Sequence, residues 1–296
     1  MNILLTGASG LIGRAINSEL TKQGNTVYPL VRNRREGPFF YMQETDEIFL
    51  DQSIHLGAVI NLAGVNISER RWNPKVKEQI VQSRVRTTEI LSDAIANLKE
   101  KPDVYLSASA IGYYGTNSSS ILSESSPAGK DFLAQLAVDW ERATKPAQAA
   151  EIRTCLLRFG LVLSPAGGMI KNLLLPFRLA CVGPIGSGHQ MLSWISLPDT
   201  VSIMTELITD KRFSGAINLV SGHPASSLGF AKALSDSIKR PALPKIPAGI
   251  VRMMFGEVAD AALLVGAKVT SERISELDIN LQHTDLNQCL GDIIRT

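Results

Sequence analysis

Hydrophobic and polar positions in the first half of the chain follow two alternating patterns. Short, mainly apolar runs have the length and composition of buried strands. Longer stretches between them repeat apolar residues three and four positions apart, which is typical of amphipathic helices. We therefore expect an α/β fold, a doubly wound parallel sheet whose strands are joined by right-handed helical crossovers. The expected strands are Asn2–Leu5, Thr26–Val31, Glu47–Leu50, Ala58–Ala63, Val104–Ser109 and Arg153–Val162, and the expected helices are Leu11–Leu20, Lys75–Leu98 and Asp131–Ala149.

The pattern changes after about Ser164. Glycine-rich loops at residues 167–168 and 183–188 interrupt it, and prolines break the connection before a last helical stretch at Ala248–Leu264. We predict one domain over residues 1–165 and a smaller region over residues 166–296. This second region is expected to pack over the cofactor sheet on the substrate side and to return a strand, Ala216–Val220, to it.

Length, composition and charge narrow the class of protein. The chain has 296 residues, 45% hydrophobic and 20% charged, so it can bury a sizeable core and is not disordered. The net charge of +2 provides no broad basic field, which excludes nucleic acid and favours a small-molecule partner. No apolar run reaches the ~18 residues of a membrane helix, and Met1 leads directly into a strand-like run without room for a signal peptide. The cysteines and histidines lack metal-ligand spacing, so we expect a cytoplasmic protein with reduced thiols and no metal.

A glycine-rich sequence, TGASGLIG, follows the first strand and opens the first helix. Gly7 permits a tight turn, Gly10 lets the backbone approach a pyrophosphate, and Gly13 lets helix and strand pack closely. The N–H groups at the helix N-terminus favour phosphate oxygens. The pattern predicts a nucleotide-binding, Rossmann-like sheet; a purely structural turn is the alternative. The predicted cofactor contacts here are Thr6, Gly7, Gly10, Leu11, Ile12 and Gly13.

The end of the second strand indicates which dinucleotide is bound. An acidic residue there would favour NAD, whereas this chain has Val31 and Arg32. A guanidinium suits a 2′-phosphate, so we predict NADP; an ordinary solvated basic loop is the alternative. Leu62, Ala63 and Gly64 end the fourth strand, where small residues let the backbone run along the cofactor. The alternative there is a buried strand that ends at a glycine turn.

Several further motifs accompany these two. They are Ser107–Gly115 (SASAIGYYG), Arg71-Trp72-Asn73, Pro176-Phe177-Arg178, residues 183–190, and Ser193-Trp194-Ile195 with Asp199. Together with the glycine loop they resemble the atypical, extended short-chain dehydrogenase/reductases. Within that group they are most similar to the YfcH-like epimerase family proteins, which are NAD-dependent epimerase/dehydratase-like and end in a domain of unknown function. The resemblance spans essentially the whole chain. It implies NADP(H) binding, a small substrate-covering C-terminal region, and further cofactor contacts at Gln79 and Arg84.

Short-chain dehydrogenases normally use a tyrosine, with a lysine four residues later, to move the proton. None of the five tyrosines here is followed by lysine at that spacing, which by resemblance is a feature of the atypical group. The catalytic candidates are therefore Ser109, at the end of the fifth strand, and Tyr113 and Tyr114 just beyond it. Their alternative role is to line the cofactor and to pack a loop.

The glycine-rich segment of the second half contributes candidates for substrate binding. His189, Gln190 and Trp194 lie in or beside it, and its glycines suggest a loop that approaches a ligand closely. A turn-rich crossover with Trp194 as a core anchor is the alternative.

Two functions follow from these observations. The first is an NADP(H)-binding oxidoreductase or an epimerase-like enzyme that acts on a small molecule, with sugar nucleotides as a candidate class. The second is a non-catalytic NADP(H)-binding sensor or regulatory protein. The missing tyrosine–lysine pair favours the second function, and the retained hydroxyl groups favour the first.

Overall fold

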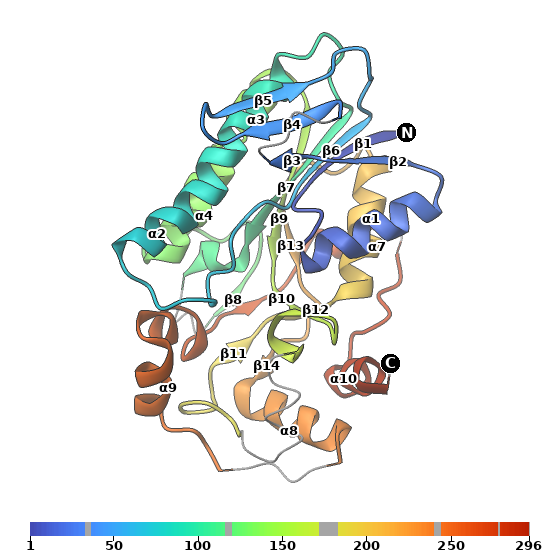
Figure 1. Ribbon diagram of the computed structural model, residues 1–296. Helices are drawn as coiled ribbons and strands as arrows, with labels where there is room; N and C mark the ends of the chain where they lie inside the picture. Colours follow the sequence, from blue (N-terminus) through green and yellow to red (C-terminus); the bar gives the residue numbers. More distant parts are fainter. Residues whose placement is uncertain (33–36, 116–119, 172–182, 240–243, 278, 296) are drawn as a thin grey trace.

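A six-stranded parallel sheet forms the centre of the protein (Figure 1). The computed structural model describes residues 1–32, 37–115, 120–171, 183–239, 244–277 and 279–295. The strands lie side by side in the order β13-β9-β7-β6-β1-β2. The chain first runs from β1 to its neighbour β2 at one edge, and then returns to the other side of β1 to form β6 and the remaining strands. This reversal confirms the doubly wound fold, and ligands of such sheets bind at the carboxyl ends of the strands beside it. The strands are β1 (Asn2–Thr6), β2 (Thr26–Pro29), β6 (Ala58–Asn61), β7 (Val104–Ala110), β9 (Arg153–Phe159) and β13 (Gly215–Leu219).

Both faces of the sheet are covered by helices. Ile3 and Leu5 of β1 belong to one core, together with Ile16, whereas Leu4 belongs to the other core, together with Leu91. Burial of each side chain of this size stabilises the fold by about 1.5–3 kcal/mol, so the apolar runs of the strands require cover on both sides. In Figure 1, α1 (Leu11–Lys22) and α7 (Leu197–Thr209) lie on one side of the sheet, and α2 (Pro74–Val81), α3 (Thr87–Ala96) and α4 (Phe132–Arg142) lie on the other.

The two longer helices expected from the sequence, Lys75–Leu98 and Asp131–Ala149, are each divided in the structure. The first consists of α2 (Pro74–Val81), a π-helix η1 (Gln82–Arg86) and α3 (Thr87–Ala96). Asn73 begins it by accepting the N–H of Val76 at 2.9 Å. The second consists of α4 (Phe132–Arg142) and α5 (Lys145–Ala149). A π turn changes the direction of the side chains that follow it and is frequent at functional sites.

A separate three-stranded sheet lies beside the central one. It consists of β3 (Val31–Arg32), β4 (Phe39–Met42) and β5 (Glu47–Leu50). The strand expected at Glu47–Leu50 therefore forms, but it pairs antiparallel with β4 and does not enter the central sheet. Arg32 lies at the end of β3 and is exposed.

Residues after 166 contribute both to the central layers and to a region below them. The strand expected at Ala216–Val220 is β13, which pairs with β9, and α7 packs beside α1. The central sheet is thus completed by residues beyond the first 165. The lower region of Figure 1 contains β11 (Met191–Leu192), β14 (Ala225–Ser226), α8 (Ser227–Ser237), α9 (Ala248–Phe255), η3 (Ala259–Leu263) and α10 (Leu286–Arg295).

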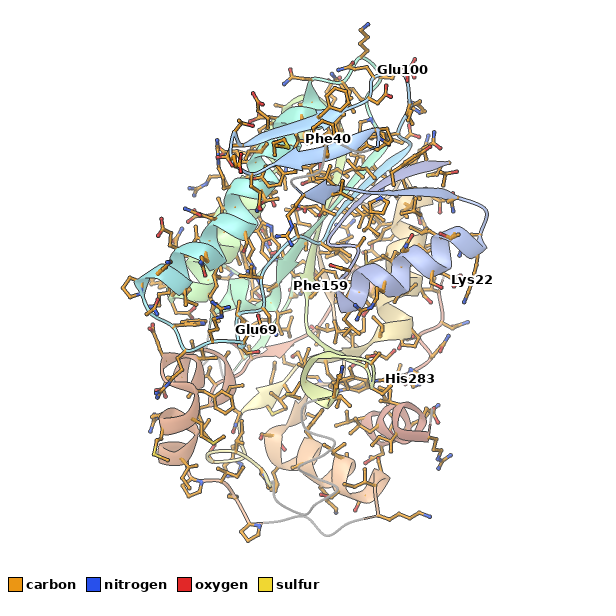
Figure 2. All side chains as sticks on the ribbon, in the orientation of Figure 1. Lys22, Phe40, Glu69, Glu100, Phe159 and His283 are labelled. Carbon is orange, nitrogen blue, oxygen red and sulfur yellow. The ribbon has the colours of Figure 1, made fainter. Side chains whose placement is uncertain are left out.

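Short elements connect these parts. They are η2 (Ile111–Tyr114), β8 (Ile121–Leu122), β10 (Leu161–Leu163), β12 (Trp194–Ser196), β15 (Lys268–Val269) and η4 (Ile274–Glu276). Arg71 joins the loop after β6 to the lower region, because its Nη2 donates to the carbonyl oxygen of Met253 at 2.8 Å. Glu69 of the same loop lies between the central layers and α9 in Figure 2.

Candidate functional site

The glycine-rich loop after β1 lies at the point where the strand order reverses. Gly7 has φ +67°, and a Cβ atom on it would lie 2.4 Å from the carbonyl oxygen of Leu62. A Cβ on Gly13 would lie 2.1 Å from the carbonyl oxygen of Gly7, so both positions require glycine. Gly10 is the N-cap of α1, and within the described residues no side chain caps this helix. The amides that begin α1, those of Leu11, Ile12 and Gly13 among them, are therefore available to an anion.

Thr6 joins the ends of β1 and β6. Its hydroxyl donates to Asn61 Oδ1 at 2.6 Å and accepts the N–H groups of Leu62 (3.0 Å) and Ala63 (3.1 Å). Thr6 is buried, so its side chain fixes the neighbouring backbones and does not itself face solvent. The residues predicted for the cofactor at these two strand ends are therefore brought together.

A cavity of about 780 Å³ opens between the small three-stranded sheet and α2. Arg32 and Gln79, both predicted for the cofactor, line it, and so do Tyr41, Arg70, Ser83 and Arg86. Arg86 is already neutralised, because it binds Asp46 (3.1 Å) and Glu89 (2.9 Å). Within the described part of the chain, no hydrogen bond or ion pair engages the Arg32 side chain. The cavity therefore offers this guanidinium to an anionic ligand.

Tyr41 and Asp46 form a polar pair in the wall of this cavity. The Tyr41 hydroxyl donates to Asp46 Oδ1 at 2.9 Å. Burial, followed by the effect of this carboxylate, raises the pKa of Tyr41 to about 12. At physiological pH, Tyr41 is therefore neutral, and its hydroxyl forms a hydrogen bond in the wall of the cavity.

Arg84 lies on η1 behind the end of β6 and is half-buried. Its Nη2 donates to the carbonyl oxygen of Val65 at 2.9 Å, and its guanidinium lies over the Trp140 ring, 5.2 Å from the centroid. A Cβ on Gly64 would lie 3.2 Å from Arg84 Cζ, so glycine permits this close approach. Burial lowers the pKa of Arg84 to about 10, and no carboxylate among the described residues pairs with it. Arg84 thus supports the backbone at Gly64 and adds uncompensated positive charge behind it.

A second polar group lies at the carboxyl end of β7. Ser109 is buried, and its Oγ donates to Glu141 Oε1 at 2.7 Å. Glu141, on α4, binds Arg158 of β9 through two parallel contacts, Nε to Oε1 at 2.7 Å and Nη2 to Oε2 at 2.9 Å. Burial opposes the charge of Arg158, but the hydrogen bond and ion pair with Glu141 outweigh burial and raise the pKa of Arg158 above its ordinary value. Phe159, the next residue, lies near the middle of the molecule in Figure 2, between the sheet and the lower region.

The two predicted tyrosines differ in their surroundings. Tyr114 is buried; its hydroxyl donates to Asn218 Oδ1 at 2.7 Å and accepts from Arg158 Nη1 at 2.9 Å. Burial raises the pKa of Tyr114, although Arg158 acts in the opposite direction. Tyr113 is half-buried, and Arg158 Cζ lies 3.5 Å from the centroid of its ring. Among the described residues, the Tyr113 hydroxyl has no hydrogen-bond partner. The three catalytic candidates therefore meet around one ion pair, Ser109 at the carboxylate of Glu141 and the two tyrosines at the guanidinium of Arg158.

Sequence reasoning did not identify Glu141 and Arg158. Their sequence context nevertheless contained a signal, because each is a charged residue within an otherwise apolar run of a strand or a helix. Arg158 interrupts a buried strand, and Glu141 follows Trp140 on the buried face of α4. Charged residues are seldom buried without a partner, so both positions implied one.

The chain matches the model of the NAD dependent epimerase/dehydratase family over residues 3–219. It belongs to this family. Epimerase family protein Mb2239 of Mycobacterium bovis is 36% identical over 291 residues, which cover 98% of this chain and 96% of that protein. The crystal structure of human epimerase family protein SDR39U1 (isoform 2) with NADPH is 30% identical, covers 100% of this chain and 99% of its own, and superposes with a TM-score of 0.90. UDP-glucose 4-epimerase of Thermotoga maritima, solved with UDP-glucose, is 16% identical with a TM-score of 0.76, covers 100% of this chain and 99% of its own, and shows the shared fold.

Membership of the family confirms the resemblance. The three residues predicted for substrate binding differ in their burial and in their contacts. Trp194 is fully buried and packs with Phe230, and its Nε1 donates to the carbonyl oxygen of His223 at 2.9 Å. Gln190 donates to the carbonyl oxygens of Ile185 and Leu263, and His189 is exposed. In the described part of the chain, these side-chain hydrogen bonds stay within the C-terminal region.

The remaining expectations concern metals, membranes and cysteines. The described residues contain no group of three His, Cys, Asp or Glu that could hold a metal ion. No helix in the described ranges is long and apolar enough to cross a membrane. Cys155 and Cys289 are buried free thiols, whereas Cys181 and the Pro176-Phe177-Arg178 motif lie outside the described residues.

Proposed function

We propose that this protein binds NADP(H) across the reversal point of its sheet. The observation that carries the proposal is the combination of an uncapped helix N-terminus behind a glycine turn with a cavity that offers Arg32. The first suits a pyrophosphate and the second a 2′-phosphate. The human relative solved with NADPH, 30% identical over the whole chain, supports the same assignment.

The proposed activity is that of an oxidoreductase or epimerase-like enzyme which begins by reducing a carbonyl group. Bound NADPH would supply the hydride, and the protein must supply a proton to the carbonyl oxygen. An ordinary tyrosine has a pKa near 10, so it donates a proton at neutral pH far more readily than it removes one. Among the described residues the Tyr113 hydroxyl has no partner and is available for this step, while Ser109 and Tyr114 give their hydrogens to Glu141 and Asn218. The candidate substrates are carbonyl compounds and sugar nucleotides, the latter because fold relatives are solved with UDP-sugars.

The alternative is a non-catalytic NADP(H) sensor. It is favoured by the apolar buried side chains of α4, the helix expected to carry the missing tyrosine–lysine pair. The cytoplasmic location and the domain boundary at residues 165 and 166 stay predictions for either function.

One screen separates the two functions. NADPH consumption is followed at 340 nm with panels of small carbonyl compounds and sugar nucleotides, and each hit is repeated with Tyr113→Phe. A substrate whose turnover falls by about 10²- to 10⁴-fold in Tyr113→Phe supports the enzyme. Tight NADPH binding without turnover on any panel supports the sensor.

A further inference from the structure

The ion pair between Glu141 and Arg158 is buried far more deeply than a surface pair. The Glu141 side chain is 10% exposed and the Arg158 side chain 5%. Two parallel N–H···O contacts fix both groups in one plane. Removing two charges from water costs free energy that the pair seldom returns as net stability, so a buried pair of this kind calls for a reason besides stability.

Each end of the pair contacts a candidate catalytic side chain. Glu141 accepts the hydrogen of Ser109, and Arg158 reaches both tyrosines, by a hydrogen bond to Tyr114 and by its position over the ring of Tyr113. The pair comes from α4 and β9, whereas the three hydroxyls come from the end of β7 and from η2. One pair of charges therefore connects every hydroxyl that was predicted to act.

The hydrogen bonds assign different roles to the three hydroxyls. A hydroxyl has one hydrogen, and Ser109 gives it to Glu141, so the Ser109 oxygen has only lone pairs left for a further hydrogen bond. Tyr114 gives its hydrogen to Asn218 in the same way. Tyr113 has no described partner and is half-buried, so its hydrogen is free for a substrate. A cation over its ring stabilises the negative charge that forms when this hydrogen leaves.

We propose that Glu141 and Arg158 are positioning residues, which hold Tyr113 as the proton donor and Ser109 as a hydrogen-bond acceptor. The inference rests on the proposed function. In the step, the carbonyl carbon receives hydride from NADPH and the carbonyl oxygen receives the proton of Tyr113. The C=O π bond, the Tyr113 O–H bond and a C–H bond of the dihydronicotinamide break, a C–H and an O–H bond form on the substrate, and NADPH leaves as NADP⁺. The Tyr113 phenolate then regains a proton from water, and Arg158 remains charged throughout.

The test must keep the protein folded. Arg158→Met alone would leave the Glu141 carboxylate buried without its partner, which is strongly destabilising. The double variant Glu141→Gln/Arg158→Met removes both charges together and keeps an oxygen that accepts the Ser109 hydrogen. Arg142→Met is the matched control, because Arg142 lies on the same helix and forms an exposed pair with Asp139.

The first readout is the environment of the Tyr113 ring, which needs no substrate. Protein labelled with 3-fluorotyrosine is studied by ¹⁹F NMR, and the Tyr113 resonance is identified by its loss in Tyr113→Phe. We expect the same chemical shift in the wild type and in Arg142→Met, and a move toward the shift of free fluorotyrosine in the double variant. An unmoved Tyr113 resonance in the double variant would overturn the positioning role.

The second readout uses the substrate found in the screen. The double variant should lower kcat by about 10- to 100-fold, with KM and the NADPH Kd within about twofold of the wild type. Adding Tyr113→Phe to it should cost much less than in the wild type, since the donor is already misplaced. A kcat equal to the wild-type value overturns the proposal. If the Tyr113 resonance moves but the wild type turns over no substrate, the contact of Arg158 with Tyr113 is supported and the proposed enzymatic function is refuted. Failure of the positioning role and failure of the proposed function are thus distinguishable.

Discussion

Replacing Arg32 with alanine should remove the preference for NADPH over NADH. Arg32 lines the cavity and its side chain, among the described residues, has neither an ion pair nor a hydrogen bond, so its charge is available to the 2′-phosphate. A hydrogen bond to a charged group contributes about 1.5–3 kcal/mol. Arg32 is exposed, and solvent screening favours the lower end of this range, about 1.5 kcal/mol, which is roughly a tenfold difference in Kd.

The assay is a fluorescence titration of each cofactor into the wild type, Arg32→Ala and Arg32→Lys. The wild type should bind NADPH about tenfold more tightly than NADH, and Arg32→Ala should bind both alike. Arg32→Lys should retain part of the preference, because lysine keeps the charge without the bidentate geometry. Raising the salt concentration should narrow the preference in the wild type. Equal affinities for NADPH and NADH in the wild type at low salt would refute the assignment of Arg32.

Three further predictions follow from the site. Gly10 has φ −71° and ψ 174°, which valine adopts readily, so Gly10→Val should keep the far-ultraviolet circular dichroism spectrum. The valine side chain should abolish NADPH binding, because it would occupy the space where the pyrophosphate approaches the backbone, and unchanged binding would show that the phosphates lie elsewhere. Tyr114→Phe should lower the free energy of unfolding in urea by about 1–3 kcal/mol, because it leaves buried partners unsatisfied, whereas Tyr113→Phe should not; equal effects would contradict the assigned roles. The pKa of Tyr41 is raised to about 12, so the stability that its protonated hydroxyl contributes is present below pH 10 and is lost as the pH rises toward 12. Tyr41→Phe should therefore flatten the dependence of the free energy of unfolding on pH in that range. The same pH dependence in the wild type and in Tyr41→Phe would contradict the burial of Tyr41.

The parts of the fold that could be predicted from sequence are those set by local patterns. Apolar runs identified the strands because each must be buried on two faces, as Leu4 and Leu5 of β1 are. The glycine turn was identifiable because Gly7 and Gly13 occupy positions where a Cβ would overlap with backbone atoms. Both signals depend on residues that are close in sequence or on backbone geometry alone.

The parts that escaped prediction depend on partners distant in sequence. Nothing near Ser109 indicates that Glu141 will accept its hydrogen, because α4 and β7 meet only when the crossover is folded. Strand β5 was expected at the right residues, but its partner β4 and the separate sheet depend on the path of the intervening chain. Trp194 was offered as a substrate contact or a core anchor, and only its surroundings show the buried position.

The late position of β13 in the chain also affects how the protein folds during synthesis. This edge strand is formed by residues 215–219 and pairs with β9, at residues 153–159. Until it emerges from the ribosome, β9 has an open row of backbone N–H and C=O groups, which is a template for pairing with another chain. Pairing distant segments also slows folding, because a long loop must close first. A nascent chain that ends near residue 165 therefore exposes β9 as a temporary edge, and β9 gains its native neighbour only after β13 has been synthesised.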